Sequence, residues 1–106
     1  MTEFVKVAKV ADIEDGQRLL IEVDDVIIAL FNVGGRFYCI EDVCTHDGGP
    51  VAEGEMDGFE IECPRHGALF DIRDGSALTM PAVVPVPTYQ VKLEGDDIYV
   101  ESPDNW

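Results

Sequence analysis

Basic residues are scarce in this chain of 106 residues, which has seven Lys and Arg against 22 Asp and Glu and a formal net charge of −15. A protein that binds the phosphate backbone of a nucleic acid needs a cationic surface, so the composition excludes that class of partner. An acidic surface can keep a protein soluble, or it can steer the protein toward a partner with a basic face. Both interpretations stay open, and they are compatible with each other.

Long apolar runs and sustained helical periodicity are also missing. No stretch approaches the roughly 18 apolar residues of a membrane-spanning helix. Residues 1–6 lack the basic and apolar regions that begin a secretory signal. We therefore expect a soluble, cytoplasmic protein that does not bind a membrane. The length allows one domain of ordinary size, residues 1–106.

Runs of β-branched and apolar residues, separated by short turn signals, predict an all-β fold. Asp24-Asp25 and the segment 32–35 are the clearest tight turns. Pro81, Pro85 and Pro87 exclude a central strand in that stretch, and the tail from residue 102 to 106 is expected to fray. The predicted strands are residues 2–10, 18–23, 26–31, 36–40, 59–62, 70–73, 89–94 and 98–101.

Both histidines of the chain lie beside two of its three cysteines. Cys44-Thr45-His46 and Cys63-Pro64-Arg65-His66 each offer one thiolate and one imidazole from a short loop, which predicts a four-ligand metal site. Zinc sites more often pair like residues, a Cys-x-x-Cys knuckle with a His pair. Two Cys and two His are also the ligands of a Rieske [2Fe–2S] centre, in which two histidines replace two cysteines on one iron.

The pattern C-x-H…C-P-x-H-G resembles the Rieske iron–sulfur domain family. The resemblance implies antiparallel sheets, a small two-loop cluster-binding subdomain at about residues 41–71, and a Pro-rich loop that covers the cluster. It implies one Rieske-type [2Fe–2S] cluster as the cofactor, with Cys44 and Cys63 on one iron and His46 and His66 on the other. Cys39 then has no partner for a disulfide, which fits a reducing compartment, and we interpret it as a small buried side chain.

The chain departs from the high-potential members of this family at four positions. Those members join the positions of Gly49 and Arg65 by a disulfide, which this chain cannot form. They also place a Ser and a Tyr, both donors to sulfur, where this chain has Ala68 and Phe70. Fewer hydrogen bonds to sulfur and an acidic surround disfavour the addition of an electron. We predict a reduction potential near the low end of the Rieske range, about −150 mV.

No catalytic residue is predicted. The sequence offers no pair of nucleophile and base and no phosphate loop, and both histidines are already assigned, which leaves none for a mononuclear iron site. The chain is similar to the Rieske-type ferredoxins of ring-hydroxylating dioxygenase systems. This similarity implies a one-electron carrier between a flavin-dependent ferredoxin reductase and a terminal oxygenase, monomeric in solution.

The predicted partners have basic docking faces, because Glu41 to Glu62 contains eight carboxylates and no Lys or Arg. Three other functions stay open. The chain could be the small subunit of an assimilatory nitrite reductase, a fixed partner rather than a shuttle. It could be a ferredoxin for iron–sulfur assembly or for another oxidase. It could also be a structural zinc module, which the order of Cys and His disfavours.

Overall fold

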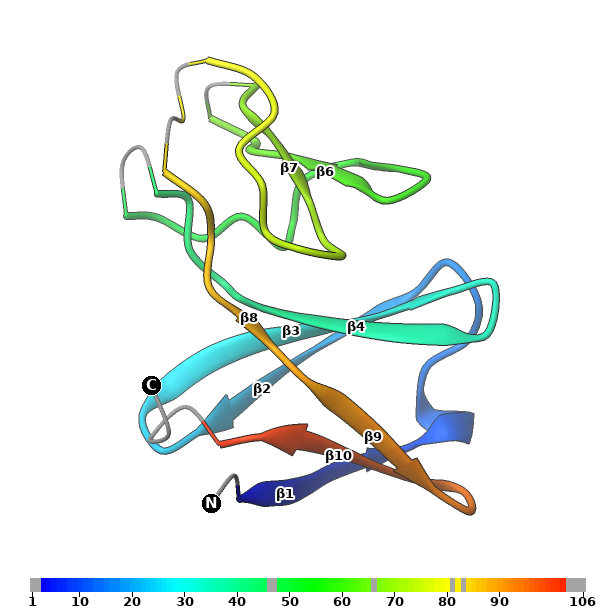
Figure 1. Cartoon of the computed structure of the whole chain (residues 1–106). Coiled ribbons are helices and arrows are strands. Elements are labelled where there is room, and N and C mark those ends of the chain that lie inside the picture. Colours follow the sequence, from blue (N-terminus) through cyan, green and yellow to red (C-terminus); the bar gives the residue numbers. More distant parts are fainter. Residues whose placement is uncertain (1–2, 46–47, 66, 81, 83, 103–106) are drawn as a thin grey trace.

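The chain forms three antiparallel sheets (Figure 1), in a computed structural model that describes residues 3–45, 48–65, 67–80, 82 and 84–102. The strand orders are β1-β10-β9 in the base sheet, β2-β3-β4-β8 in the middle sheet and β5-β6-β7 in the upper sheet. The prediction of an all-β fold is confirmed.

The elements are β1 (Phe4–Lys9), the 3-10 helix η1 (Val10–Asp12), β2 (Arg18–Val23), β3 (Val26–Val33), β4 (Arg36–Glu41), β5 (Met56–Asp57), β6 (Glu60–Glu62), β7 (Leu69–Asp71), β8 (Thr88–Tyr89), β9 (Val91–Glu94) and β10 (Asp97–Glu101).

The centre of the middle sheet, residues 28–32 of β3, is buried on both faces. Ile28 and Leu30 of β3 pack in a lower core against the base sheet, while Ala29 and Phe31 pack in an upper core that contains Cys44 and Cys63. Successive side chains of a strand point to opposite faces, so a strand covered on both sides reads as a continuous apolar run. This explains the run in β3 and places the upper half of the molecule, residues 42–87, on top of the sheet (Figure 1).

The turn predicted at residues 32–35 is shorter than expected. β3 continues through Asn32 and Val33, and only Gly34 and Gly35 form the turn, with φ of +64° and +86°. Asn32 is buried because its side chain donates a hydrogen bond to the Ile13 carbonyl oxygen and accepts one from the Gly35 amide. An Asn with both ends of its amide satisfied inside the protein can stay in a strand, although the residue type favours turns.

The strand predicted at residues 89–94 is divided between two sheets. Tyr89 in β8 pairs with Cys39 of the middle sheet, and Val91 in β9 pairs with Val100 of the base sheet. The chain thus leaves one sheet and enters another at Gln90 (Figure 1). A single apolar run predicts an extended backbone but not which sheet each part joins. The switch binds the two lower sheets together.

Two further expectations are corrected. Met56–Asp57 forms β5, a short partner of β6 that the sequence did not predict. The expected fraying of the tail is wrong at Ser102, which is buried. Its backbone amide donates a hydrogen bond to the Glu3 carbonyl oxygen, and its hydroxyl donates one to Asp24. Residues 103–106 lie outside the described residues. Among the described residues, no helix is long and apolar enough to cross a membrane.

Candidate metal centre

The two cysteine loops have the same backbone geometry. The Cys44 amide donates to the Gly49 carbonyl oxygen at 2.7 Å, and the Gly48 amide donates back to the Cys44 carbonyl oxygen at 2.7 Å. In the second loop the corresponding bonds run from Cys63 to Ala68 at 2.7 Å and from Gly67 to Cys63 at 2.9 Å. Each loop therefore closes over the same number of residues. The fifth residue of each is a glycine with φ of +78° or +73°, a conformation in which a side chain is strained.

Both thiols lie inside the upper core. Cys44 is 0% exposed and Cys63 is 1% exposed, and they share this core with Ala68 and Phe70, which are buried as well. No disulfide joins any of the three cysteines, all of which are described. A buried pair of thiols in matched loops fits a group that binds through two thiolates, because a metal removes the cost of burying ionised sulfur.

The other two predicted ligands, His46 and His66, lie outside the described residues. Of the four predicted ligands, the structure describes Cys44 and Cys63. Within the described ranges no group of three or more His, Cys, Asp or Glu side chains lies together as a metal site. The described donor set thus consists of Cys44 and Cys63, and the chemistry of two thiolates fits the predicted cluster.

Arg65 connects the two cysteine loops. Its Nη1 donates a hydrogen bond to the Pro50 carbonyl oxygen at 2.7 Å. A Cβ atom added to Gly49 would lie 2.7 Å from Cζ of Arg65, so the guanidinium fills the space beside that glycine. The sequence identified these two positions only as places that lack a disulfide. The family resemblance implied that these two positions lie side by side, but the sequence did not predict that Arg65 would bond to Pro50 there.

Arg18 and Asp42 bond to the backbone of residues 51–54, which follow the first cysteine loop. Nη1 of Arg18 donates to the Gly54 carbonyl oxygen at 2.6 Å and also to the Ala52 carbonyl oxygen. Oδ1 of Asp42 accepts the amides of Val51 and Ala52, both at 2.8 Å. Charged groups that satisfy backbone groups make strong, directional hydrogen bonds. Arg18 comes from β2, so the middle sheet positions the loop that follows Cys44. Sequence reasoning missed both residues.

The described residues of the segment 76–87 bond to the first cysteine loop and to β7, the strand that follows the second loop. Oγ1 of Thr45 donates to the Val84 carbonyl oxygen at 2.6 Å. The amide of Leu78 donates to the Leu69 carbonyl oxygen, and the Leu69 amide donates to Oγ1 of Thr79. Ala82 is buried in the upper core. The described part of this segment therefore shares the upper core with Cys44 and Cys63.

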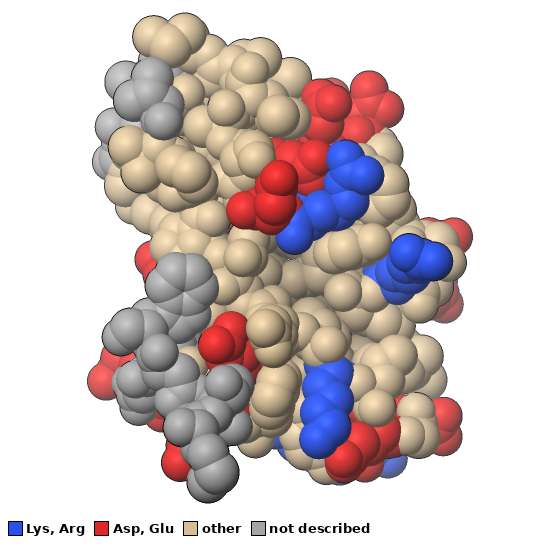
Figure 2. Space-filling model, in the orientation of Figure 1, with Lys and Arg blue, Asp and Glu red and all other residues tan. Residues whose placement is uncertain are grey.

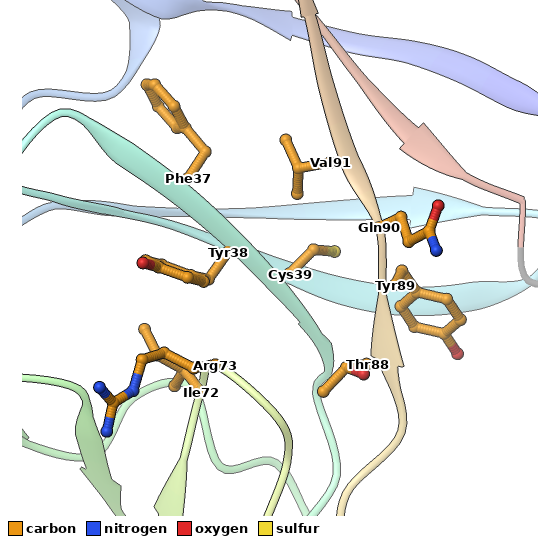
Figure 3. Close-up of a pocket in the computed structure, with 9 residues that line it drawn as sticks. All are labelled: Phe37, Tyr38, Cys39, Ile72, Arg73, Thr88, Tyr89, Gln90 and Val91. Carbon is orange, nitrogen blue, oxygen red and sulfur yellow. The ribbon is translucent and has the colours of Figure 1, made fainter.

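Cys39 lies away from the other two cysteines. It is 2% exposed, belongs to the lower core and lines a cavity of about 210 Å³ between β4 and the strand formed by β8 and β9 (Figure 3). Burial raises the pKa of its thiol to about 12, so the sulfur stays protonated at neutral pH. The interpretation of Cys39 as a small buried side chain is confirmed.

Acidic side chains gather on one flank of the upper half. Glu53, Glu55 and Glu62 line a groove of about 320 Å³ together with Gly54 and Pro64. Figure 2 shows acidic side chains on the right of the upper half, whereas the described surface at its upper left is uncharged. Three carboxylates of the acidic run between Glu41 and Glu62 therefore lie beside Pro64 of the second cysteine loop.

Comparison with known proteins places this arrangement in a family. Residues 3–90 match the Rieske [2Fe-2S] domain. The 3-phenylpropionate/cinnamic acid dioxygenase ferredoxin subunits of Escherichia coli K12 and Shigella boydii are each 46% identical over 96 residues, 90% of either chain. The ferredoxin of carbazole 1,9a-dioxygenase from Nocardioides aromaticivorans IC177 superposes with a TM-score of 0.89 at 31% identity, covering 93% of this chain and 97% of that one. Sphingomonas yanoikuyae B1 ferredoxin superposes with a TM-score of 0.87 at 31% identity, covering 95% of this chain and 100% of that one. The chain therefore belongs to the Rieske [2Fe–2S] domain family, and it is an electron-carrying ferredoxin with one Rieske-type cluster.

Proposed function

We propose that Cys44 and Cys63 bind one iron of the cluster and that His46 and His66 bind the other. The observation that carries this proposal is the matched pair of cysteine loops, each of which presents a buried thiol to the upper core. In each loop a histidine follows its cysteine within three residues, so both loops can contribute to both irons. The bound cluster takes up and releases one electron.

The proposed partners are a flavin-dependent ferredoxin reductase as electron donor and a terminal ring-hydroxylating oxygenase as acceptor. The relatives at 46% identity are named as ferredoxin subunits of a dioxygenase. A solved complex of reduced oxygenase and oxidized ferredoxin in carbazole 1,9a-dioxygenase contains a chain that is 33% identical to this one, with a TM-score of 0.86 over 92% of both chains. These similarities support the oxygenase as partner, and the reductase follows from the need for an electron source.

The residues around the thiols favour a low reduction potential. Ala68 and Phe70 are both fully buried beside the cysteines and carry no hydroxyl group that could donate to sulfur. The acidic flank adds negative charge nearby, which opposes the addition of an electron. We expect a potential of about −150 mV, and an Ala68→Ser variant should have a higher one. A wild-type potential above about +100 mV would contradict this account.

The proposed organisation is one Rieske domain over residues 1–106, with a cluster-binding subdomain at about 41–71. The upper core supports a subdomain of this kind, although it also draws in Ala82 and Val86 from beyond residue 71. We further propose that the protein is monomeric and works in the cytoplasm, where it moves between the reductase and the oxygenase.

Electron paramagnetic resonance of the dithionite-reduced protein tests the cofactor and its ligands. The wild type should give the rhombic signal of a His-ligated [2Fe–2S] cluster. Cys44→Ser and His66→Ala variants should lose this signal or change its shape, while Cys39→Ala should keep it. A colourless protein that contains zinc would instead identify a structural metal module.

Reconstitution with partner proteins tests the role in electron transfer. The reductase and oxygenase components of the Escherichia coli 3-phenylpropionate/cinnamic acid dioxygenase are suitable probes because that system contains a close relative. Product formation should require this chain together with both components. Stable purification of the chain with a sirohaem subunit would instead support the nitrite reductase alternative.

A further inference from the structure

One positive charge lies within the cysteine loops. Arg65 is the only Lys or Arg in the sequence between Arg36 and Arg73, a stretch that contains both loops. It stands immediately before the predicted ligand His66. The eight carboxylates from residue 41 to residue 62 make the rest of this stretch strongly acidic. The loops proposed to hold the cluster therefore carry a cation in an otherwise acidic part of the chain.

The guanidinium of Arg65 is held in one place. Its Nη1 donates a hydrogen bond of 2.7 Å to the Pro50 carbonyl oxygen, and its Cζ lies 2.7 Å from the position of a Cβ atom on Gly49. The Gly49 carbonyl oxygen in turn accepts the Cys44 amide at 2.7 Å. A cation of the second loop is thus fixed against the residues that close the first loop. A carbonyl group carries no net charge, so the bond to Pro50 holds the guanidinium without neutralising it.

A carboxylate also contacts the second loop. Oε1 of Glu62 lies 3.5 Å from the position of a Cβ atom on Gly67, the glycine whose amide donates to the Cys63 carbonyl oxygen. Glu62 immediately precedes Cys63 and lines the acidic groove. The second loop therefore has a cation in its own sequence and an anion directly before its cysteine.

We propose that Arg65 tunes the reduction potential of the cluster, because its fixed positive charge favours the reduced form and offsets part of the effect of the carboxylates. This inference rests on the proposed function, since it needs a cluster held by the two loops. Reduction adds one electron from the reductase, so the reduced form carries one more negative charge than the oxidised form. A nearby cation stabilises the more negative form and a nearby anion destabilises it. Arg65 therefore raises the potential, and Glu62 lowers it.

The two charges act on the two electron transfers in opposite ways. A higher potential makes the transfer from the reductase to this protein more favourable, and a lower potential does the same for the transfer to the oxygenase. Arg65 thus assists the first transfer and Glu62 the second. The potential of the protein reflects the balance between them.

The exposure of both side chains gives the effect a recognisable signature. Arg65 and Glu62 are exposed, and counterions screen exposed charges as the ionic strength rises. A change in potential that is caused by a lost charge becomes smaller at high salt. A change that is caused by an altered loop structure does not. Salt dependence therefore separates tuning by charge from a structural role of Arg65.

The test uses the full chain with its cluster. Arg65→Gln and Arg65→Met both remove the charge, and the Gln side chain can still donate to the Pro50 carbonyl oxygen. Arg65→Lys keeps the charge on a more flexible side chain. Glu62→Gln removes the opposing charge. The matched control is Lys92→Met, which removes a positive charge from β9 in the base sheet, on the other side of the middle sheet from the cysteine loops (Figure 1).

The reduction potential of each form is measured by redox titration of the visible absorbance at low and at high salt. Electron paramagnetic resonance first checks that the cluster is intact. Both neutral variants at Arg65 should lower the equilibrium constant for reduction about fivefold at low salt, or by about 40 mV, since tenfold is about 59 mV for one electron. Glu62→Gln should raise this constant by a similar factor, and the double variant Arg65→Gln with Glu62→Gln should return close to the wild type. Arg65→Lys and Lys92→Met should also stay close to it, and every shift should shrink at high salt.

Four results would overturn the inference. Neutral variants at Arg65 that keep the wild-type potential at low salt would show that its charge does not act on the cluster. Shifts of equal size at low and high salt, or a shift in Arg65→Lys as large as that in Arg65→Gln, would assign the change to the structure of the loops. Loss of the cluster from both neutral variants would make Arg65 a structural residue. A wild type without a Rieske signal would contradict the proposed function itself, and the inference would fall with it.

Discussion

Arg65 donates a hydrogen bond to the carbonyl oxygen of Pro50, so a side chain of the second cysteine loop directly holds the first. The same guanidinium fills the space where a side chain on Gly49 would lie. High-potential relatives were expected to crosslink these two positions through sulfur. In this chain the link is a reversible, charged hydrogen bond, which restrains the loops without consuming a cysteine.

Substitutions at both ends of this contact should not be additive. Arg65→Met removes the hydrogen bond to Pro50 and should lower the free energy of unfolding by about 1 kcal/mol. Gly49→Ala should cost a similar amount, because its Cβ would displace the guanidinium. The double variant should then cost little more than either single one. The midpoint of cluster loss in urea, followed by visible absorbance, measures this, and strictly additive shifts would exclude the contact.

Gly54→Ala should prevent normal folding of the upper half. A Cβ on Gly54 would overlap the carbonyl oxygen of Glu62, a backbone atom that cannot move aside, and Glu62 immediately precedes Cys63. We expect a cost of about 3 kcal/mol or more, with poor cluster incorporation. Gly58→Ala is the control. Gly58 has φ of +61° but open space around it, so its cost should be about 1 kcal/mol of backbone strain. Similar unfolding curves for the two variants would refute the close approach.

The ion pair between Asp71 and Arg73 should make stability depend on pH in one direction. The Arg73 guanidinium bonds to both carboxylate oxygens, at 3.0 and 2.7 Å, and holds the pKa of Asp71 below its ordinary value. Because the folded-state pKa is the lower one, the stabilisation is fully present above about pH 4 and is lost as the pH falls through the folded-state value.

Asp71→Asn should therefore destabilise the protein at neutral pH and have a diminishing effect as the solution becomes acidic. The free energy of unfolding, measured by urea titration at several pH values, gives this difference directly. In an Arg73→Met background the Asp71→Asn change should lose most of its pH dependence, because the guanidinium is gone and only the backbone amide of residue 73 still donates to the carboxylate. An effect of Asp71→Asn that is the same at every pH would show that the pair contributes nothing through its charge.

Cys39 should be inert in the folded protein. Its buried thiol has a pKa of about 12, so almost no thiolate is present at neutral pH, and reagents cannot reach it. Iodoacetamide should leave Cys39 unmodified until urea unfolds the chain, as mass spectrometry of tryptic peptides can show. Cys39→Ala should keep the full cluster and lose about 1 kcal/mol of stability through the small cavity that it leaves. Rapid alkylation in the folded state would contradict the burial.

The predictable features of this chain are those that depend on residues close together in sequence. Cys44 and Cys63 could be identified because each lies within three residues of a histidine, and the Asp24-Asp25 turn because two such residues tolerate positive φ, here +50° and +68°. Contacts between distant segments left no comparable signal. Arg18 bonding to the loop after Ala52, and Arg65 bonding to Pro50, depend on how separate segments pack.

Local patterns also failed where burial overrode preference. Asn32 favours a turn, yet it lies in β3 because Ile13 and Gly35 satisfy its side-chain amide. The identity of Gln90 does not predict that the chain passes from one sheet to another there. The passage depends on the strands that pair with Tyr89 and Val91 on either side. In both cases the deciding residues are distant in sequence or belong to another sheet.

The base sheet pairs β1 with β10, which lie at the two ends of the described chain. During synthesis both cysteine loops and the segment 76–87 leave the ribosome before the residues of β10 are made. β1 has no strand partner in this sheet until then, and closing so long a loop is a slow, entropically costly step. A nascent chain thus presents Cys44 and Cys63 while its lower core is still open. A chain that stops before β10 would leave β1 without its partner strand and the lower core open.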